Sequence, residues 1–372
     1  YEDANGASIS EDPGTAVRTF SFESFATASD AELVISEGSE NDDVNDGRML
    51  NVHATSVTND ERIFEFTLEA KGDSDLKIET FGVNVDVTGA PNIEDFISGE
   101  TAPAIFLELD GEEYGTATFF DQPAGTTLQD EDIVFSDVDY ILESGDKITG
   151  RIIIDILALS GDIDAGDTIT VTLGETETDQ ATLVRVEDES GTILADADIT
   201  GSAASDAHEV RDVGFVFSLT GTTAKVTTVG DAAAAAPTSD IGTFTQTFTA
   251  TAYDGDIAID KTCAEDENQG DNGEGQSVIA TNAGSNTATC SLGTKDAINS
   301  TVSANSWLVP SGQTRTFTIT TALTATADHF AKSYIEALNW DVDANAAAAT
   351  LFLTAGLGEN NSSTDEIFLN DN

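Results

Sequence analysis

Residues 64–87 read FEFTLEAKGDSDLKIETFGVNVDV, with apolar side chains at alternate positions before and after an acidic turn. Phe64, Phe66 and Leu68 form the first apolar series, and Val87 ends the second. A period of two residues places alternate side chains on opposite faces of an extended chain. The stretch therefore predicts two β-strands, each with one buried face.

The same alternation recurs along the chain. Further runs span residues 104–109, 148–159, 169–173, 213–219, 244–252, 314–323 and 367–369. Gly-containing turns separate them at Asp110-Gly111, Ser144-Gly145, Ser160-Gly161, Ala165-Gly166, Asp254-Gly255 and Ser311-Gly312. Many short strands with such turns are typical of sandwiches and barrels. The predicted fold class is all-β: two tandem Ig-like β-sandwich domains preceded by a β-forming N-terminal segment.

Two stretches of the chain repeat one another. Residues 66–78 align with 248–259 across a short gap, and residues 144–156 align in the same order with 311–323. The repeat predicts two homologous modules. The alternative is a chance likeness between amphipathic strands. The predicted units are an N-terminal segment (1–49), a first sandwich (50–204) and a second sandwich (205–372).

Apolar side chains near both ends of the chain are candidate assembly strands. They are Val17, Phe20, Phe22 and Phe25 near the start, and Ile367 and Leu369 near the end. The leading segment either completes a sheet in its own module or adds a strand to a neighbouring subunit.

The chain carries 69 acidic and 14 basic residues, a formal net charge of -55. Such a field repels nucleic acid and anionic lipid, so neither is an expected partner. The charge is tolerable in molar salt, which screens repulsion, or with divalent cations bound to the carboxylates. We find no apolar run long enough for a transmembrane helix.

Cys263 and Cys290 are the only cysteines, and the segment between them is polar. We expect a disulfide that closes a surface loop, since free thiols or a metal pair fit this setting less well. The sequence starts at Tyr1 without a methionine, from which we expect a removed leader and an extracellular, cell-surface location.

Acidic loops are candidate Ca²⁺ sites, because hard oxygen ligands suit this ion. The residues are Asp73 and Asp75, their repeat counterparts Asp254 and Asp256, and the group Asp162, Asp164 and Asp167. None has EF-hand spacing, and a solvated acidic loop is the alternative for each. Candidate glycosylation sites are Asn299, Asn360 and Asn361.

Catalytic motifs are missing from the sequence. His53, His208 and His329 stand apart from one another, and we interpret them as surface residues. We find no nucleophile elbow, zinc-protease helix or phosphate-binding loop. The sequence therefore predicts a protein that is not an enzyme.

Several of these patterns resemble a known class of protein. The alternation from Phe64 to Val87, the strands after Ser144-Gly145 and Ala165-Gly166, and the passage 201–219 resemble modules of exported surface proteins of uncultured ultrasmall bacteria. That resemblance implies Ig-like folds in a surface layer or extracellular filament, and it transfers no site residue.

The leading functional hypothesis is a structural subunit of an extracellular filament or surface layer that self-assembles through β-strand edges. Its expected partners are copies of itself, with surface glycans or cations as further candidates. The alternative is a cell-surface adhesin or ligand-binding module.

Overall fold

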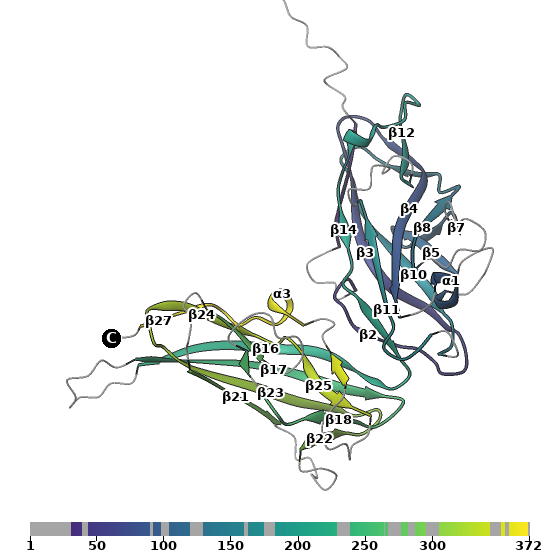
Figure 1. The fold of residues 1–372 in the computed structure, drawn as a ribbon. Coiled ribbons are helices and arrows are strands. Elements are labelled where there is room, and N and C mark those ends of the chain that lie inside the picture. Colours follow the sequence, from purple (N-terminus) through teal and green to yellow (C-terminus); the bar gives the residue numbers. More distant parts are fainter. Residues whose placement is uncertain are drawn as a thin grey trace, which may run out of the picture.

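Two β-sandwich modules make up the protein, and they meet at one end, which gives the bent outline in Figure 1. The computed structural model describes residues 31–38, 44–89, 92–97, 104–119, 129–159, 163–174, 183–228, 239–263, 265–266, 277–281, 287–294, 305–342, 351–353 and 357–370. No helix within these ranges is both long and apolar enough to cross a membrane.

The first module packs two sheets around one core. Its elements are β1 (Glu32–Glu37), β2 (Met49–Asn51), β3 (Thr58–Lys71), β4 (Leu76–Thr88), α1 (Ile93–Phe96), β5 (Ile105–Leu109), β6 (Glu112–Tyr114), β7 (Thr116–Phe119), β8 (Asp130–Ser136), β9 (Tyr140–Leu142), β10 (Lys147–Ile156), β11 (Thr168–Leu173), β12 (Arg185–Asp188), η2 (Asp196–Asp198), β13 (Ile199–Gly201), β14 (Ala203–Ala204) and β15 (His208–Arg211). One sheet has the order β13-β1-β3-β10-β5-β6 and the other β2-β15-β11-β4-β8-β7. Strands β9 and β12 also pair with β4, and β14 with β11.

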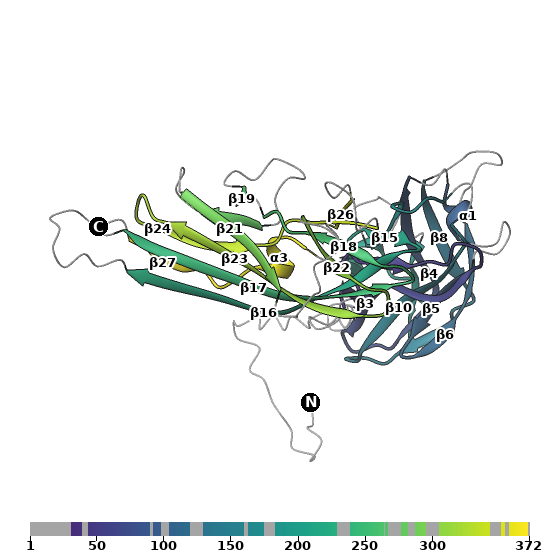
Figure 2. The same cartoon turned by 90° about the horizontal axis from the view of Figure 1, so that it is seen from below.

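The second module is built around a long antiparallel sheet of order β16-β17-β23-β21. Its elements are β16 (Gly214–Thr228), β17 (Asp240–Tyr253), β18 (Ile257–Asp260), β19 (Glu265–Asp266), β20 (Ser277–Thr281), β21 (Thr287–Thr294), β22 (Ser306–Val309), β23 (Thr314–Thr324), β24 (His329–Tyr334), β25 (Leu338–Asp341), β26 (Leu351–Leu353), α3 (Glu359–Ser362) and β27 (Ile367–Leu369). Two smaller sheets, β22-β18-β25-β26 and β19-β20-β24-β27, complete the sandwich. Figure 2 shows β16, β17 and β23 running along the length of this module. The prediction of an all-β sandwich fold is confirmed.

The sequence repeat corresponds to a repeat of structure. The Asp75 carboxylate accepts a hydrogen bond from the Ser144 backbone N–H at 2.9 Å, and Asp256 accepts one from the Ser311 N–H at 2.8 Å. In both modules this hydrogen bond lies at one end of an antiparallel strand pair. The pair is β3 with β10 in the first module and β17 with β23 in the second. The order β1-β3-β10-β5 thus corresponds to β16-β17-β23-β21.

Aromatic side chains on the inner faces fill both cores. In the first module the rings of Phe66 and Phe81 stack with centroids 5.0 Å apart, which joins the two sheets. Gly150 pairs with Phe66, and a Cβ at this glycine would lie 2.3 Å from the phenyl ring. In the second module Phe248 stacks on Phe317 with centroids 5.4 Å apart. Burial of these rings, with the other apolar side chains of the two cores, is a major favourable contribution to folding.

The boundary between the modules differs from the predicted position at residue 204. Strand β15 belongs to the first module, because it pairs in parallel with β2 and antiparallel with β11. Strand β1 of the predicted N-terminal segment also lies in the first module, between β3 and β13. The candidate strand at Val17–Phe25 lies outside the described residues.

The interpretation of the histidines as surface residues is wrong for two of the three. His208 is fully buried and His329 nearly so, whereas His53 is exposed. The His208 ring shares a 2.7 Å hydrogen bond between Nε2 and the Ile63 carbonyl oxygen. Burial lowers the pKa of His208 to about 4, so the ring is neutral at pH 7.

A charged cluster crosses the outer face of the β3-β10-β5 sheet. Arg151 contacts Glu65 at 2.9 Å and Glu108 at 2.8 Å, and the Glu65 side chain is 2% exposed. The backbone of Glu65 is held by Asn45, whose side chain both donates and accepts a hydrogen bond there. Removing the cation would leave a buried carboxylate without its counter-charge.

We predict that Arg151→Met lowers the free energy of unfolding by about 3 kcal/mol, because the Glu65 carboxylate stays buried and loses the charge of the Arg151 guanidinium. The matched control is Arg185→Met, which removes an exposed arginine from Glu79 and Glu187 and should cost much less stability, because water screens an exposed pair. Urea unfolding at pH 7 measures both values. Equal losses in the two variants would contradict this account.

We predict a second, pH-dependent effect at His208. Its pKa is about 4 in the folded protein and about 6.5 when unfolded, so the unfolded chain binds the extra proton between these values. Stability from this residue is complete above pH 6.5 and falls by up to about 1.4 kcal/mol per pH unit towards pH 4. His208→Gln does not titrate, so its stability should fall less steeply over this range. Parallel curves for the two proteins would refute the assignment.

Candidate functional site

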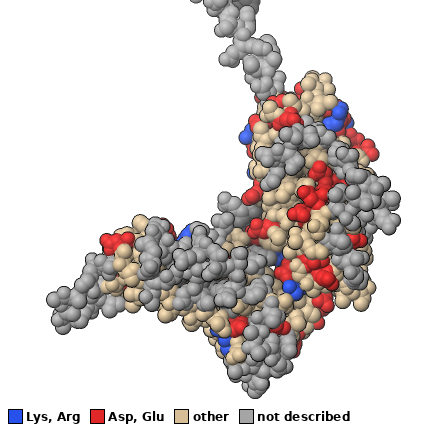
Figure 3. All heavy atoms as spheres, viewed as in Figure 1, with Lys and Arg blue, Asp and Glu red and all other residues tan. Residues whose placement is uncertain are grey.

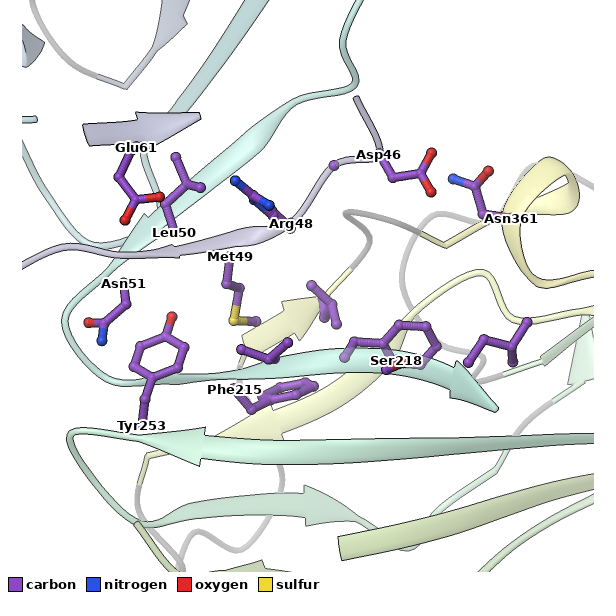
Figure 4. Close-up of a pocket in the computed structure, with 15 residues that line it drawn as sticks. Asp46, Arg48, Met49, Leu50, Asn51, Glu61, Phe215, Ser218, Tyr253 and Asn361 are labelled. Carbon is purple, nitrogen blue, oxygen red and sulfur yellow. The ribbon is translucent and has the colours of Figure 1, made fainter. Parts of the chain in front are cut away.

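A cavity of about 610 Å³ lies where the two modules meet. Residues 46–51 of the first module line one side, and Phe215–Leu219 of β16 line the other (Figure 4). Leu353 of β26 and Asn361 of α3 add to the wall. Cavities at the junction of two domains are common sites for ligands.

The cavity combines apolar walls with a few polar groups. Met49, Leu50, Phe217, Leu219 and Leu353 supply apolar surface. Polar side chains that line it are Asp46, Arg48, Asn51, Glu61, Ser218, Tyr253 and Asn361. Figure 4 shows Asp46 and Asn361 facing one another at one end, and Asn51 and Tyr253 at the other. Apolar walls interspersed with polar groups suit an amphipathic ligand.

Asp46, Arg48 and Glu61 set the charge at the first-module wall. Burial raises the pKa of Glu61, and the nearby Arg48 guanidinium partly offsets this effect. The Arg48 guanidinium also donates to the backbone carbonyl of Arg62. This wall therefore offers the Arg48 cation and two carboxylates, Asp46 and Glu61, of which Glu61 protonates more readily than usual.

Direct contacts hold the modules together beside the cavity. Met49 of β2 is buried in the core of the second module, next to Phe215 and Trp340. The Arg211 guanidinium lies 5.1 Å above the Trp340 ring, and Asn51 donates to Asp254 at 3.0 Å. These residues reach the junction from β2, β15 and β25, so sequence patterning within single strands gave no signal for them.

Tyr253 sits at the floor of the junction. Its hydroxyl is buried and has no hydrogen-bond partner among the described residues. Burial raises the pKa of this phenol, so it stays protonated. A Cβ on Gly214 would lie 2.4 Å from the hydroxyl and 3.0 Å from the Met49 sulfur, so only glycine fits there.

Strand β16 forms the edge of its sheet beside the cavity. It pairs with β17 along its length, and the described residues place no strand on its other side. Val216 on this edge is 56% exposed. The strand GFVFSLTGTTAKVTT has no acidic residue and no proline, and its bulge (between Leu219 and Gly221) and its lysine (Lys225) come after residues 215–219, which line the cavity, so this first part of the edge carries no blocking feature.

The carboxylates of the candidate calcium sites accept hydrogen bonds, mostly from distant parts of the chain. Asp75, Asp254 and Asp256 accept the hydrogen bonds given above, and Asp167 accepts one from the Asp164 N–H at 2.9 Å. Asp162 lies outside the described residues. Within those residues no three His, Cys, Asp or Glu side chains converge as metal ligands. Calcium binding stays a prediction.

The other predicted sites fall in different parts of the molecule. Cys263 and Cys290 form a disulfide with Cα atoms 5.4 Å apart. Strand β27, which contains Ile367 and Leu369, pairs with β24 of its own module, so it is part of a sheet within the chain. Asn299 lies outside the described residues, and Asn360 and Asn361 fall in α3. Glycosylation stays a prediction.

Comparison with known proteins gives no assignment. No family model matches the sequence, and no curated protein does. Among solved structures, the C-terminal domain of the antigen I/II polypeptide BspA from Streptococcus agalactiae is 7% identical, with 91% of this chain and 100% of that chain covered and a TM-score of 0.23. The serine-rich repeat protein Srr2 from Streptococcus agalactiae is 14% identical over 83% and 87%, with a TM-score of 0.18. The secreted serine protease VesC from Vibrio cholerae is 8% identical over 80% and 50%, with a TM-score of 0.16. Scores this low establish no shared fold, and the functional argument below uses none of them.

Proposed function

We propose that this protein is a non-catalytic, cell-surface binding protein of the adhesin type, which takes up an extended peptide segment of a partner at the junction of its modules. The proposal takes the ligand-binding alternative from the sequence over the filament subunit. One observation carries it: no described strand pairs with the edge of β16 beside the cavity, whereas the matching edge in the first module is paired.

A comparison of the two modules shows that β1 and β16 are equivalent strands with differently paired edges. In the first module Leu33 pairs with Ala70 of β3, and in the second Phe215 pairs with Ala252 of β17. Ala70 and Ala252 are equivalent, because each carbonyl accepts a hydrogen bond from the glycine of its Ser-Gly turn. Residues 33–35 of β1 pair on their other side with β13, in parallel. Residues 215–217 of β16 have no such strand among the described residues.

A peptide on β16 would therefore take the place that β13 takes in the first module. Its backbone would extend the sheet, and its alternate side chains would enter the apolar part of the cavity beside Phe217 and Leu219. In such complexes backbone hydrogen bonds supply affinity and side-chain pockets supply specificity. The partner segment is expected to be rich in apolar residues at alternate positions and poor in acidic ones, because this chain is strongly acidic.

Export is part of the proposal. The disulfide between Cys263 and Cys290 is a bond that persists in oxidising compartments. The acidic surface keeps a displayed protein soluble and stays compatible with salt-rich surroundings.

We predict that the full chain, immobilised in low salt, enriches alternating apolar peptides from a phage-displayed library and binds a synthetic copy of the enriched peptide saturably. Val216→Asp should weaken that binding at least tenfold, because a carboxylate on the cavity-lining edge would have to lose its water.

Val226→Asp is the matched control, since Val226 is an exposed valine of the same strand that does not line the cavity. The affinity of this variant for the enriched peptide should stay within about twofold of that of the unaltered protein. A library that yields no saturable ligand, or equal loss in both variants, would overturn the proposal.

A further inference from the structure

The strand that closes the sheet edge in the first module differs in direction from its neighbours. Strand β13 pairs with β1 in parallel, whereas β1 with β3, β3 with β10 and β10 with β5 are antiparallel pairs. The register sets Ile199 opposite Leu33 and Gly201 opposite Ile35. Ile199 is 2% exposed and belongs to the core of this module. This edge therefore takes a short parallel strand that directs one apolar side chain into the sandwich.

The last position of β13 requires glycine. Gly201 has a φ of +82°, and a Cβ on it would lie 2.0 Å from the Ile35 carbonyl oxygen. A Cβ cannot approach a backbone oxygen this closely, so any other residue would push the strand away from β1. Thr200, between the apolar residue and the glycine, is partly buried and donates a hydrogen bond to Glu32 at 2.6 Å. Strand β13 thus has the sequence apolar–any–glycine, in which the first and third positions are constrained by β1.

The chain of the second module follows a different path and does not supply this strand. After β23 it forms β24, β25, β26 and β27, which all pair within the two smaller sheets. In the part of the chain that the structure describes, none of them returns to β16. After β10, the counterpart of β23, the first module does return to the edge of its sheet, as β13. The place beside β16 is therefore one that this scaffold fills with its own strand in the other module.

The two edges present the same kind of side chains to a strand beside them. Phe215 is equivalent to Leu33, as the pairing with β17 and with β3 establishes, and both side chains are buried. One residue further along, both strands carry a valine. Two residues further along, the apolar side chains are Phe217 and Ile35. Ile35 is 2% exposed beside β13, whereas Phe217 is partly exposed and lines the cavity, so the second edge keeps the apolar surface that a parallel strand would cover.

We propose that the partner peptide pairs with residues 215–217 of β16 in parallel and carries the sequence apolar–any–glycine. The inference rests on the proposed function, whose site it uses, and it adds the direction, the register and two residue types of the bound segment. The apolar residue lies opposite Phe215 and points into the second module, and the glycine lies opposite Phe217. The bulge of β16 between Leu219 and Gly221 interrupts regular pairing just beyond. Backbone pairing therefore covers about three residues, as it does for β13.

An antiparallel peptide is the alternative, because antiparallel pairs are slightly more stable per residue than parallel ones. Such a peptide has no counterpart at the equivalent edge, where β13 is parallel. Nothing in this chain would then place a glycine opposite Phe217. The two directions thus predict different peptide sequences and opposite positions for the peptide termini.

The bound segment is also expected to be free of acidic side chains. Figure 3 shows many of the described carboxylates over the first module. Asp46 and Glu61 of that module line the cavity, and Arg48 is the one cation among the lining residues. Residues 215–219 of β16 carry no charge. An acidic peptide would therefore meet a repulsive field that β16 does not offset.

A synthetic peptide that copies residues 197–204 tests the proposal, with both ends blocked and with Asp198→Asn to remove its charge. We expect saturable shifts of the β16 amide signals when the full chain is titrated with this peptide and followed by NMR. Val216→Asp in the protein should weaken the binding at least tenfold, which places the peptide on β16 and not on β1. Gly201→Val in the peptide should weaken it more than tenfold, because the added Cβ would meet the β16 backbone. Thr200→Val in the peptide is the matched control and should stay within about twofold.

A nitroxide label on either end of the same peptide reports its direction. Line broadening by a nitroxide falls steeply with distance, so each label identifies the nearest amide signals of β16. In the parallel arrangement the label on the N-terminus broadens residues 214–215 most strongly, and the label on the C-terminus broadens residues 218–219.

Three results would contradict the parallel apolar–any–glycine assignment and leave the proposed function standing. They are equal affinities of the glycine and valine peptides, the opposite order of broadening, and failure of the copied peptide to bind a protein that binds peptides enriched from the library. If neither the copied peptide nor any library peptide binds, the proposed function itself is wrong.

Discussion

The rest of the structure depends on one long antiparallel strand pair in each module, which buries one of its faces. The pair is β3 with β10 in the first module and β17 with β23 in the second. The chain has few attractive charge pairs to set against its net charge of -55, so surface electrostatics opposes the compact state. Cohesion must come from apolar burial, and the inward positions of these pairs supply it with Phe66, Phe248 and Phe317 fully buried. The turn carboxylates Asp75 and Asp256 then fix the ends of both pairs.

Much of this architecture could be predicted from local sequence pattern. The alternation of apolar and polar side chains identified the long strands. Each of these strands has one buried face, and burial of one face requires an apolar residue at every second position. The repeat located the Asp75 and Asp256 turns because a turn needs particular residue types at fixed offsets. The pairing of Cys263 with Cys290 followed from there being no other cysteine.

The candidate site could not be predicted in the same way, because long-range pairing creates it. Nothing in the sequence around His208 shows that it pairs with Ile169 of β11 or that its ring meets the Ile63 carbonyl of β3. The sequence around Met49 does not distinguish it from other strand residues, although it is buried in the core of the second module. Whether β16 is an edge or a central strand depends on β13 having a counterpart, which local pattern does not encode.

The two modules share one scaffold and differ at two equivalent positions, which are the outer edge of the first strand and one cross-strand pair at the centre of the sheet. In the first module β13 pairs with the edge of β1, and the chain after β1 covers Glu65, which Arg151 neutralises. In the second, no strand of the described part pairs with the outer edge of β16, and the uncharged Thr247 and Thr318 replace the ion pair. The N-terminal 212 residues carry a net charge of -41 and the remainder only -14. The first module is therefore suited to keeping the protein soluble and copies apart, and the second is suited to contact, because the cavity-lining part of β16 carries no charge and costs less to desolvate on binding.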